Sequence, residues 1–380
     1  MDTSENQEVR NVLVLYVGGT IGMIRNESGV LKPEADIFSK KLKNISQLHD
    51  QQCFQFDTNQ SEKDILVLPL NEYKFRILYE IKEFDPLLDS SSMGSEQWKE
   101  IAFTITEVYS KYDGFVVVHG TDTLVYTASA LSFLLGNLEK PIIITGSQLP
   151  IDNSRSDGIS NLYYSLVFAG AFNIPEVCVF FDKVLLRGNR TIKISSDTFD
   201  GFVSPNYDAL ATIGCEIKLN LPVYKQTSDK LWSLDADFNP NVVVLTLYPD
   251  ISEKMIRSAF ESPTEGVVLL TFGSGNMPSN KSYIIEAIKE ATERGVLVVN
   301  CTQCLKGSVK SLYETNQVLM DVGAVSAFDM TMEATYTKLR YILAQKNLSL
   351  EERKKMMERS IRGELTSQSS CFCLIPDRAY

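Results

Sequence analysis

A strand, a polar turn and a helix follow one another within Asp113 to Phe133, and this stretch constrains the fold more than any other. Gly114 to Val118 is a largely β-branched run that is apolar on both sides, as in a parallel strand covered on both faces. From Leu124 the apolar period lengthens to that of a helix. A turn between two such elements lies at the carboxyl end of a sheet, where open α/β folds bind ligands.

The turn offers a hydroxyl on Thr121, a carboxylate on Asp122 and the free N–H groups of a helix start. Taken alone, this pattern is more typical of helix capping than of catalysis. A second turn changes the balance. The buried strand Asn11 to Val17 runs into the sequence GGTIG (residues 18–22), whose glycines permit a sharp turn and a close backbone approach. It is neither a dinucleotide-binding GxGxxG pattern nor a Walker A loop. Thr20 in this turn and Thr121 in the other therefore indicate a chemical role.

Length and the alternation of elements predict two domains. A chain of 380 residues exceeds a single typical core. We expect a larger N-terminal α/β domain with a mostly parallel sheet at 10–221 and a smaller C-terminal α/β domain at 242–366. Residues 222–241 are polar with a proline near each end and are predicted to be the linker, while 367–380 form a tail without an assignable pattern.

Charge and cysteine usage exclude several classes of protein. The net charge of −11 argues against a nucleic-acid partner. We expect no membrane span, since no apolar run approaches the roughly 20 residues required, and the first nine residues carry no signal-peptide pattern. Seven irregularly spaced cysteines fit a reducing compartment, so a cytoplasmic location is expected. Cys301 and Cys304 form a CxxC pair without a second pair or a histidine cluster, which predicts two ordinary thiols and no metal site.

In its motifs the chain resembles the L-asparaginases, and within them the cytosolic, bacterial type I branch, which also has animal members. The two threonine turns, about a hundred residues apart, correspond to the two signature motifs of that family. The resemblance extends from about residue 10 to residue 366. The matching segments are Val17 to Met23, Pro86 to Met93, Asp113 to Gly120, Thr145 to Gly158, Arg187 to Lys193, Asn300 to Gly307 and Arg362 to Thr366.

The resemblance implies an amidohydrolase that converts L-asparagine to L-aspartate and ammonia without a metal or cofactor. It implies Thr20 as the nucleophile and Thr121, Asp122 and Lys193 as a second catalytic set. It also implies that Asp89 and Ser90, with Ser91 nearby, contact the α-amino and α-carboxylate ends of the substrate. Family sites form where the second domain of one subunit covers the first domain of its neighbour. A homodimer or homotetramer with sites near the subunit interfaces is therefore expected.

The residues themselves support this chemistry. Hydrolysis of a carboxamide needs a nucleophile, a base and donors for the oxyanion. No Ser-His-Asp triad is plausible, because His49 lies in a polar stretch and His119 precedes the turn on the strand. A lysine kept neutral beside a hydroxyl can serve as the base, which is the role open to Lys193. Backbone N–H groups after Val118 are natural oxyanion donors.

One departure from the family pattern concerns the segment after the first turn. Residues 23–34 are polar, contain glycine and lack periodicity, which predicts a flexible loop suited to be an active-site lid. Many relatives place a tyrosine in this lid, but here the comparable position is about Gly29-Val30. Tyr313, in the second domain, is a candidate substitute from a neighbouring subunit; an ordinary loop aromatic is the alternative.

A second departure concerns regulation. Some type I enzymes bind asparagine at an allosteric site through an arginine and a threonine. The corresponding positions here hold Leu270 and Ile192, although Cys304 nearby is kept. Aliphatic side chains cannot bind a carboxylate or donate hydrogen bonds, so we expect this form of allostery to be absent.

Other functions remain open. Glutamine or another small amide is a close alternative, because one methylene group discriminates by only ~1–3 kcal/mol. Lysophospholipase activity, attached to some animal relatives, has no GxSxG elbow to support it here. A non-catalytic amino-acid-binding or scaffolding protein would not need both threonines, Asp122 and Lys193.

Overall fold

The computed structural model describes residues 8–53, 65–70, 73, 75–220, 238–278, 280–310 and 314–366, the first three residues of the last range by their backbone alone. The predicted tail, residues 222–237 of the predicted linker and Tyr313 lie outside the described residues. The chain divides into two compact units, one of residues 1–204 with 208–233 and the other of residues 205–207 with 234–380.

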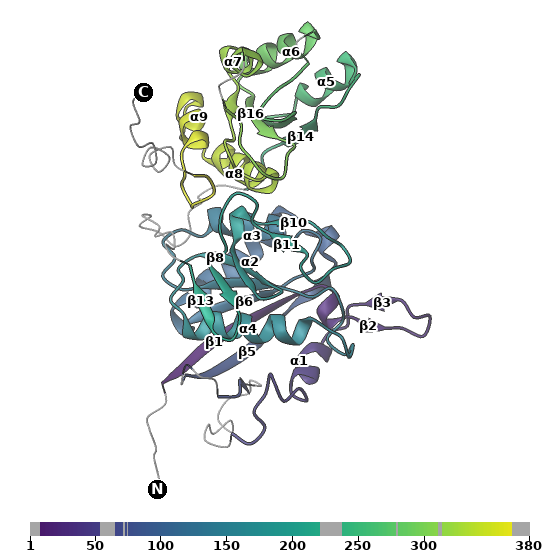
Figure 1. Cartoon of the computed structure of the whole chain (residues 1–380), viewed down its shortest axis with the longest axis vertical. Coiled ribbons are helices and arrows are strands. Elements are labelled where there is room, and N and C mark those ends of the chain that lie inside the picture. Colours follow the sequence, from purple (N-terminus) through teal and green to yellow (C-terminus); the bar gives the residue numbers. More distant parts are fainter. Residues whose placement is uncertain are drawn as a thin grey trace, which may run out of the picture. The chain divides into compact units, whose positions relative to one another are not determined.

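The first unit is built on one large sheet (Figure 1). Its strands β5, β1, β6, β7 and β8 are parallel, and antiparallel strands extend both edges. This arrangement confirms the predicted N-terminal α/β fold. Within the described residues the strand order is β13-β12-β9-β8-β7-β6-β1-β5-β4. The strands are β1 (Val9–Gly18), β4 (Leu66–Val67), β5 (Arg76–Leu88), β6 (Gly114–Val118), β7 (Ile142–Thr145), β8 (Val177–Phe181), β9 (Val184–Arg187), β12 (Ala211–Ile213) and β13 (Ile217–Leu219).

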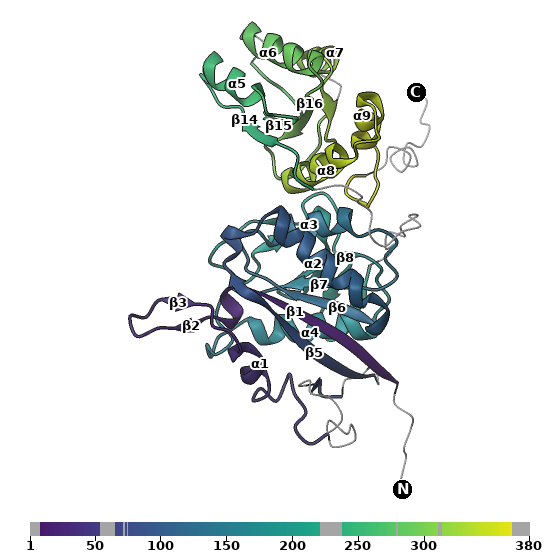
Figure 2. The ribbon, with the colours of Figure 1, turned by 180° about the vertical axis from the view of Figure 1, so that it is seen from behind.

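Helices cover both faces of this sheet. A Cβ atom on Gly114 would lie 2.0 Å from the carbonyl oxygen of Ala169 in α4 (Gly158–Ala171). The next residue, Phe115, stacks on Tyr109 just after α2 (Ser95–Val108), with ring centroids 5.6 Å apart. Successive strand residues face opposite sides, so α4 and α2 lie on opposite faces. α3 (Leu124–Leu134) packs against α2, and Figure 2 shows both from the side opposite to α4. Every residue of β6 is accordingly buried.

The direction of the strand order reverses at β1. The chain runs from β1 to β5, which pairs with one edge of β1, and later to β6, which pairs with the other edge of β1. The carboxyl ends of β1 and β6 therefore form a topological switch point, the place where doubly wound sheets bind ligands. The turns that carry Thr20 and Thr121 follow these two strand ends.

Shorter elements complete the first unit. Residues 23–34, predicted to be a loop, contain a small antiparallel hairpin of β2 (Ile24–Arg25) and β3 (Leu31–Lys32). Two-residue strands are too short to produce a pattern in the sequence. α1 (Ile37–Leu42) follows the hairpin, and β10 (Ile192–Lys193) pairs with β11 (Phe202–Val203).

The second unit is a smaller α/β domain, as predicted. Its parallel sheet has the order β14 (Val242–Thr246), β15 (Gly266–Thr271), β16 (Leu297–Thr302) and β17 (Val325–Ser326). One face packs on α5 (Glu253–Phe260), α6 (Ser282–Glu293) and α7 (Glu314–Asp321), whose apolar side chains join those of the strands in one core. On the other face, Leu339 and Leu343 of α8 (Met332–Ala344) contact Gly266, and α9 (Leu350–Glu358) packs against α8. No helix in the described part of the chain is long and apolar enough to cross a membrane.

Candidate active site

The turn that follows β1 packs its backbone directly on the turn that follows β6. A Cβ atom on Gly19 would lie 2.4 Å from the amide nitrogen of Gly120, closer than any side chain can approach. Gly19 also has a φ of 95°, in the left-handed region that favours glycine. The 3-10 turn Thr20–Gly22 follows at once. Half-buried Thr20 is thereby held beside the turn that carries Thr121.

Lys193, on β10, joins two residues of the Thr121 turn. Its Nζ lies 2.9 Å from Thr121 Oγ1 and 2.7 Å from Asp122 Oδ1. Thr121 is 8% exposed and the Lys193 side chain 16%, whereas the Asp122 side chain is 65% exposed. An ion pair this exposed contributes little to stability. The structure thus brings together Thr121, Asp122 and Lys193, three residues that the sequence placed in one catalytic set.

The end of a third strand, β5, lies beside the Thr121 turn. The backbone oxygen of Ser90, just after β5, accepts a hydrogen bond of 2.6 Å from Thr123 Oγ1. A Cβ atom on Gly120 would lie 2.6 Å from Ser90 Oγ, so the buried side chain of Ser90 packs against the Thr121 turn. Asp89 caps the next 3-10 turn by accepting from the amide of Ser91 at 2.9 Å, and both residues are exposed. Of the predicted substrate contacts, only Ser90 is tied to the Thr121 turn by a described contact.

His119 belongs to a buried hydrogen-bond chain that fixes the Gly120 peptide. Trp98 Nε1 donates to Thr127 Oγ1 over 3.0 Å, and Thr127 Oγ1 lies 2.9 Å from His119 Nε2. His119 Nδ1 lies 2.7 Å from the carbonyl oxygen of Gly120. A carbonyl oxygen can only accept, so the proton is on Nδ1, and Nε2 accepts from Thr127.

This chain has two consequences for the site. Complete burial lowers the pKa of His119 to about 4, so the ring is neutral at pH 7 and both nitrogens are engaged. His119 is therefore no candidate base. In a trans peptide the N–H of Thr121 points opposite to the Gly120 carbonyl, so the histidine directs that N–H away from itself. Sequence reasoning gave His119 no role, because its partners Thr127 and Trp98 share no spacing that would signal the network.

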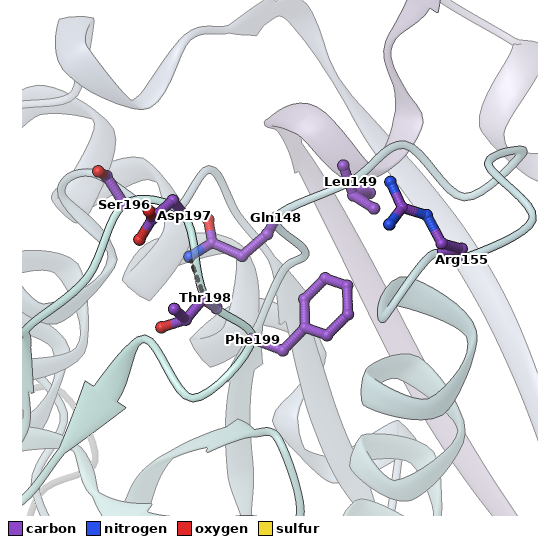
Figure 3. Close-up of a pocket in the computed structure, with 7 residues that line it drawn as sticks. All are labelled: Gln148, Leu149, Arg155, Ser196, Asp197, Thr198 and Phe199. Atoms are coloured by element: carbon purple, nitrogen blue, oxygen red, sulfur yellow. Dashed lines mark hydrogen bonds between the residues drawn. The ribbon is translucent and has the colours of Figure 1, made fainter.

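A cavity of about 360 Å³ lies between the loop that follows β7 and the loop that joins β10 to β11. Gln148 connects the two loops that line the cavity, because its Nε2 donates to the backbone oxygen of Thr198 over 2.9 Å (Figure 3). Arg155 and Phe199 face the cavity from different loops. The loop that supplies its second wall directly follows Lys193 at the end of β10, yet no predicted catalytic residue lines the cavity. The lining residues are Gln148, Leu149, Arg155, Ser196, Asp197, Thr198 and Phe199.

The two thiols of the CxxC pair differ in their surroundings. Cys301 is buried, and burial raises the pKa of its thiol to about 12, whereas Cys304 is exposed. Among the residues that the structure describes, no group of three or more His, Cys, Asp or Glu side chains is placed to hold a metal ion.

Family profiles account for both units. Residues 11–225 match the N-terminal asparaginase domain, and residues 241–357 match the glutaminase/asparaginase C-terminal domain. The chain belongs to the asparaginase family. This result confirms the family inferred from the two threonine motifs.

Individual relatives agree with this assignment. The chain is 44% identical over 361 residues to an L-asparaginase of Dirofilaria immitis, covering 94% of this chain and 61% of the relative. It is 44% identical over 358 residues to the 60 kDa lysophospholipase of Mus musculus, covering 94% and 63%. Thus it spans less than two thirds of the length of these relatives. Among solved structures, L-asparaginase I of Vibrio cholerae O1 superposes with a TM-score of 0.80 at 39% identity, covering 94% of this chain and 99% of the other.

Proposed function

We propose that this protein is an L-asparaginase that hydrolyses L-asparagine to L-aspartate and ammonia through Thr20 as the nucleophile. The observation that carries the proposal is the junction of two strand-end turns at a switch point. Gly19 rests on Gly120, and Lys193 Nζ lies within 2.9 Å of Thr121 Oγ1. The names of the relatives support an amide as substrate.

The proposed reaction runs through an ester on Thr20. The Thr20 hydroxyl attacks the side-chain amide carbon, and its proton passes by way of the Thr121 hydroxyl to Lys193. This step requires that Lys193 has first given up its ammonium proton. The N–H of Thr121 is oriented to donate to the oxyanion that develops. Collapse breaks the C–N bond, and the leaving nitrogen takes the proton that Lys193 received as ammonia departs. Water then cleaves the ester, which releases aspartate and restores the Thr20 hydroxyl.

Substrate ends are assigned to the exposed carboxylates and the serines. Asp122 is mostly exposed and can hold the substrate ammonium while it positions Lys193. Asp89 retains free lone pairs beside its capping bond, and Ser90 lies against the Thr121 turn. Tyr313 as a hydrogen-bond partner of Thr20, a homo-oligomer with shared sites, and a cytoplasmic location remain proposals drawn from the sequence.

Ammonia release from purified protein tests the proposal, with L-asparagine and L-glutamine in parallel. We expect Thr20→Ala and Lys193→Met each to lower turnover by at least ~10³-fold, because members of a catalytic unit fail together. The thermal midpoint should change little, since the Lys193–Asp122 pair is exposed.

A matched control is Lys140→Met. Lys140 is a partly buried lysine of the same unit whose Nζ donates to the backbone oxygens of Tyr109 and Tyr112 at 2.7 and 2.6 Å. This variant should lose stability and keep its turnover per folded molecule. Near-wild-type activity in Thr20→Ala or Lys193→Met would overturn the assignment of roles. Release of fatty acid from lysophosphatidylcholine, without ammonia release from either amide, would replace the proposed reaction.

A further inference from the structure

Tyr16, four residues before Thr20, buries its hydroxyl without a hydrogen-bond partner among the described residues. The residue is 0% exposed, and its ring stacks on Phe38 of α1 with centroids 4.3 Å apart. A buried hydroxyl that makes no hydrogen bond costs stability, and such groups are rare in folded proteins. This phenol therefore calls for a functional explanation.

The unpartnered hydroxyl lies directly against the turn of the proposed nucleophile. A Cβ atom on Gly22 would come within 2.1 Å of the Tyr16 hydroxyl oxygen and 3.2 Å of Phe38 Cδ2. Gly22 does not have a positive φ, so the phenol and not the backbone conformation requires glycine here. Gly22 closes the 3-10 turn that begins at Thr20, so the phenol packs against the turn that carries the proposed nucleophile.

Glu83 stands directly opposite Tyr16 in the sheet, at the paired position on β5. Its Oε2 accepts a hydrogen bond of 2.9 Å from the amide of Asp36, the residue before α1. Its Oε1 is buried and has no partner in the part of the chain that the structure describes. One unused donor, on Tyr16, and one unused acceptor, on Glu83, thus occupy paired positions on neighbouring strands.

Tyr16 and Glu83 contact the two ends of one exposed segment, residues 23–35. Tyr16 touches Gly22 at the start of residues 23–35, and Glu83 binds Asp36 at their end. Between these points the β2–β3 hairpin projects from the sheet with its tip in solvent, and Val30 is 60% exposed (Figures 1 and 2).

We propose that Tyr16 and Glu83 form the hinge of this hairpin and are positioning residues for Thr20. When substrate is bound, the Tyr16 hydroxyl donates to Glu83 Oε1, which draws the two ends of the segment together and sets the Thr20 turn. The inference rests on the proposed function for its role of Thr20. Burial and the charge of Glu83 both raise the pKa of the Tyr16 phenol, so the hydroxyl keeps its proton and remains a donor.

Tyr16→Phe separates this role from packing. The variant removes a hydroxyl that has no partner in this structure, so the thermal midpoint should stay level or rise. Turnover with asparagine should fall by about 10- to 100-fold, the scale of a misplaced reacting group, with KM changed less than kcat. Hydrogen–deuterium exchange of residues 23–35, measured with and without saturating aspartate, should show protection in the wild type that is weakened in the variant.

Two further variants make the test decisive. Glu83→Gln keeps an oxygen for the amide of Asp36 but turns its amide nitrogen, a donor, towards the phenol in place of the second oxygen. The Tyr16 hydroxyl then loses its charged acceptor, so this variant should reproduce the kinetic effect. The double variant should be no worse than either single one, because one bond is removed in each case. Tyr79→Phe is the control: Tyr79 is another buried tyrosine, on β5, whose hydroxyl donates to the Leu48 carbonyl at 2.7 Å. It should lower the thermal midpoint and leave kcat and the exchange of residues 23–35 unchanged.

The outcomes distinguish the two proposals. Wild-type kcat and wild-type exchange in both Tyr16→Phe and Glu83→Gln would overturn the hinge, even if asparagine is hydrolysed. Altered exchange of residues 23–35 in a protein that hydrolyses no amide would keep the hinge and overturn the proposed function. If Tyr16→Phe does not fold, unchanged kinetics and exchange in Glu83→Gln are by themselves enough to reject the hinge.

Discussion

At the scale of single residues, the proposed catalytic groups depend on neighbours that take no part in the chemistry, and His119 is the plainest example. Its neutral ring holds the Gly120 carbonyl and so orients the N–H of Thr121. The arrangement requires that the ring carry no second proton, because Nε2 must accept from Thr127.

This requirement predicts a dependence of stability on pH. The pKa of His119 is about 4 in the folded chain and 6.5 as the ordinary value, so the unfolded chain binds more protons between these limits. The free energy of unfolding should therefore be highest above pH 6.5 and fall as the pH falls towards 4, by up to about 3 kcal/mol. Urea unfolding at a series of pH values measures this slope.

His119→Asn, which offers an amide donor in place of Nδ1, should flatten that slope relative to the wild type. His49→Asn serves as the comparison, because burial also lowers the pKa of His49 but this ring accepts from the amide of Val67 and does not bond the Gly120 peptide. An unchanged slope in His119→Asn would show that the histidine is not the titrating group.

How well single residues can be predicted depends on whether their neighbours are close in sequence. Thr20 and Thr121 follow buried strands and stand in recognisable turns, so the sequence pointed to them directly. Lys193 came only from the family resemblance, because a lysine in a strand carries no signal of its own. Phe38 and Glu83 near Tyr16, and Thr127 beside His119, lie on other strands and helices, and no local pattern indicates such contacts.

At the scale of elements, the second unit is fastened by a buried ion pair between α8 and the segment that follows α9. Lys338 and Glu364 are both 0% exposed, and Lys338 Nζ lies 2.6 Å from Glu364 Oε1. Lys338 also donates to the backbone oxygens of Met357 and Arg359. Burial raises the pKa of Glu364, but the ammonium of Lys338 and backbone N–H groups outweigh this, and its pKa is lowered overall.

Lys338→Met should lower the free energy of unfolding by about 3–5 kcal/mol, because it leaves a buried carboxylate without its cation. Adding Glu364→Gln to this variant should recover most of the loss, since the uncompensated charge is then gone. Chemical unfolding of both variants measures the effect. Equal stability of Lys338→Met and wild type would mean that the carboxylate is already neutral or reaches water.

The elements found from the sequence were those with a single, long pattern. The apolar runs of β1 and β6 were evident, as was the helix that begins at Leu124. β5 was not predicted, because Arg76 to Leu88 alternates apolar residues with five charged ones. Only about half of the residues in such a strand face the core, so no long apolar run marks it. Its antiparallel neighbour, β4, is two residues long.

At the scale of the whole molecule, the fold class and family were accessible from the sequence, because the motifs extend over nearly the whole chain. The two-domain expectation rested on length and on the alternation of strands and helices. What could not be predicted was the strand order, which depends on contacts between segments a hundred residues apart.

The response of the intact protein to asparagine concentration should be close to hyperbolic. Ile192 is buried on β10 and Leu270 lies on β15, and neither offers a polar group to an amino-acid effector. Initial rates over a wide range of asparagine concentrations give the Hill coefficient. A value clearly above one that returns to one on substituting residues around Cys304 would show that other side chains build an effector site.

The central place of β1 also governs when the site can form during synthesis. Val12 of β1 pairs with Gly114 of β6. About a hundred more residues must therefore be synthesised before β1 can pair with β6, its second neighbour. At about 5–20 residues per second, a ribosome needs on the order of 5–20 s to supply them. Throughout that interval the nascent chain carries an apolar strand with at least one bare edge, the kind of segment that chaperones retain and that aggregates readily. Thr20, the proposed nucleophile, is thus translated early, yet it reaches its place only after much of the unit has emerged.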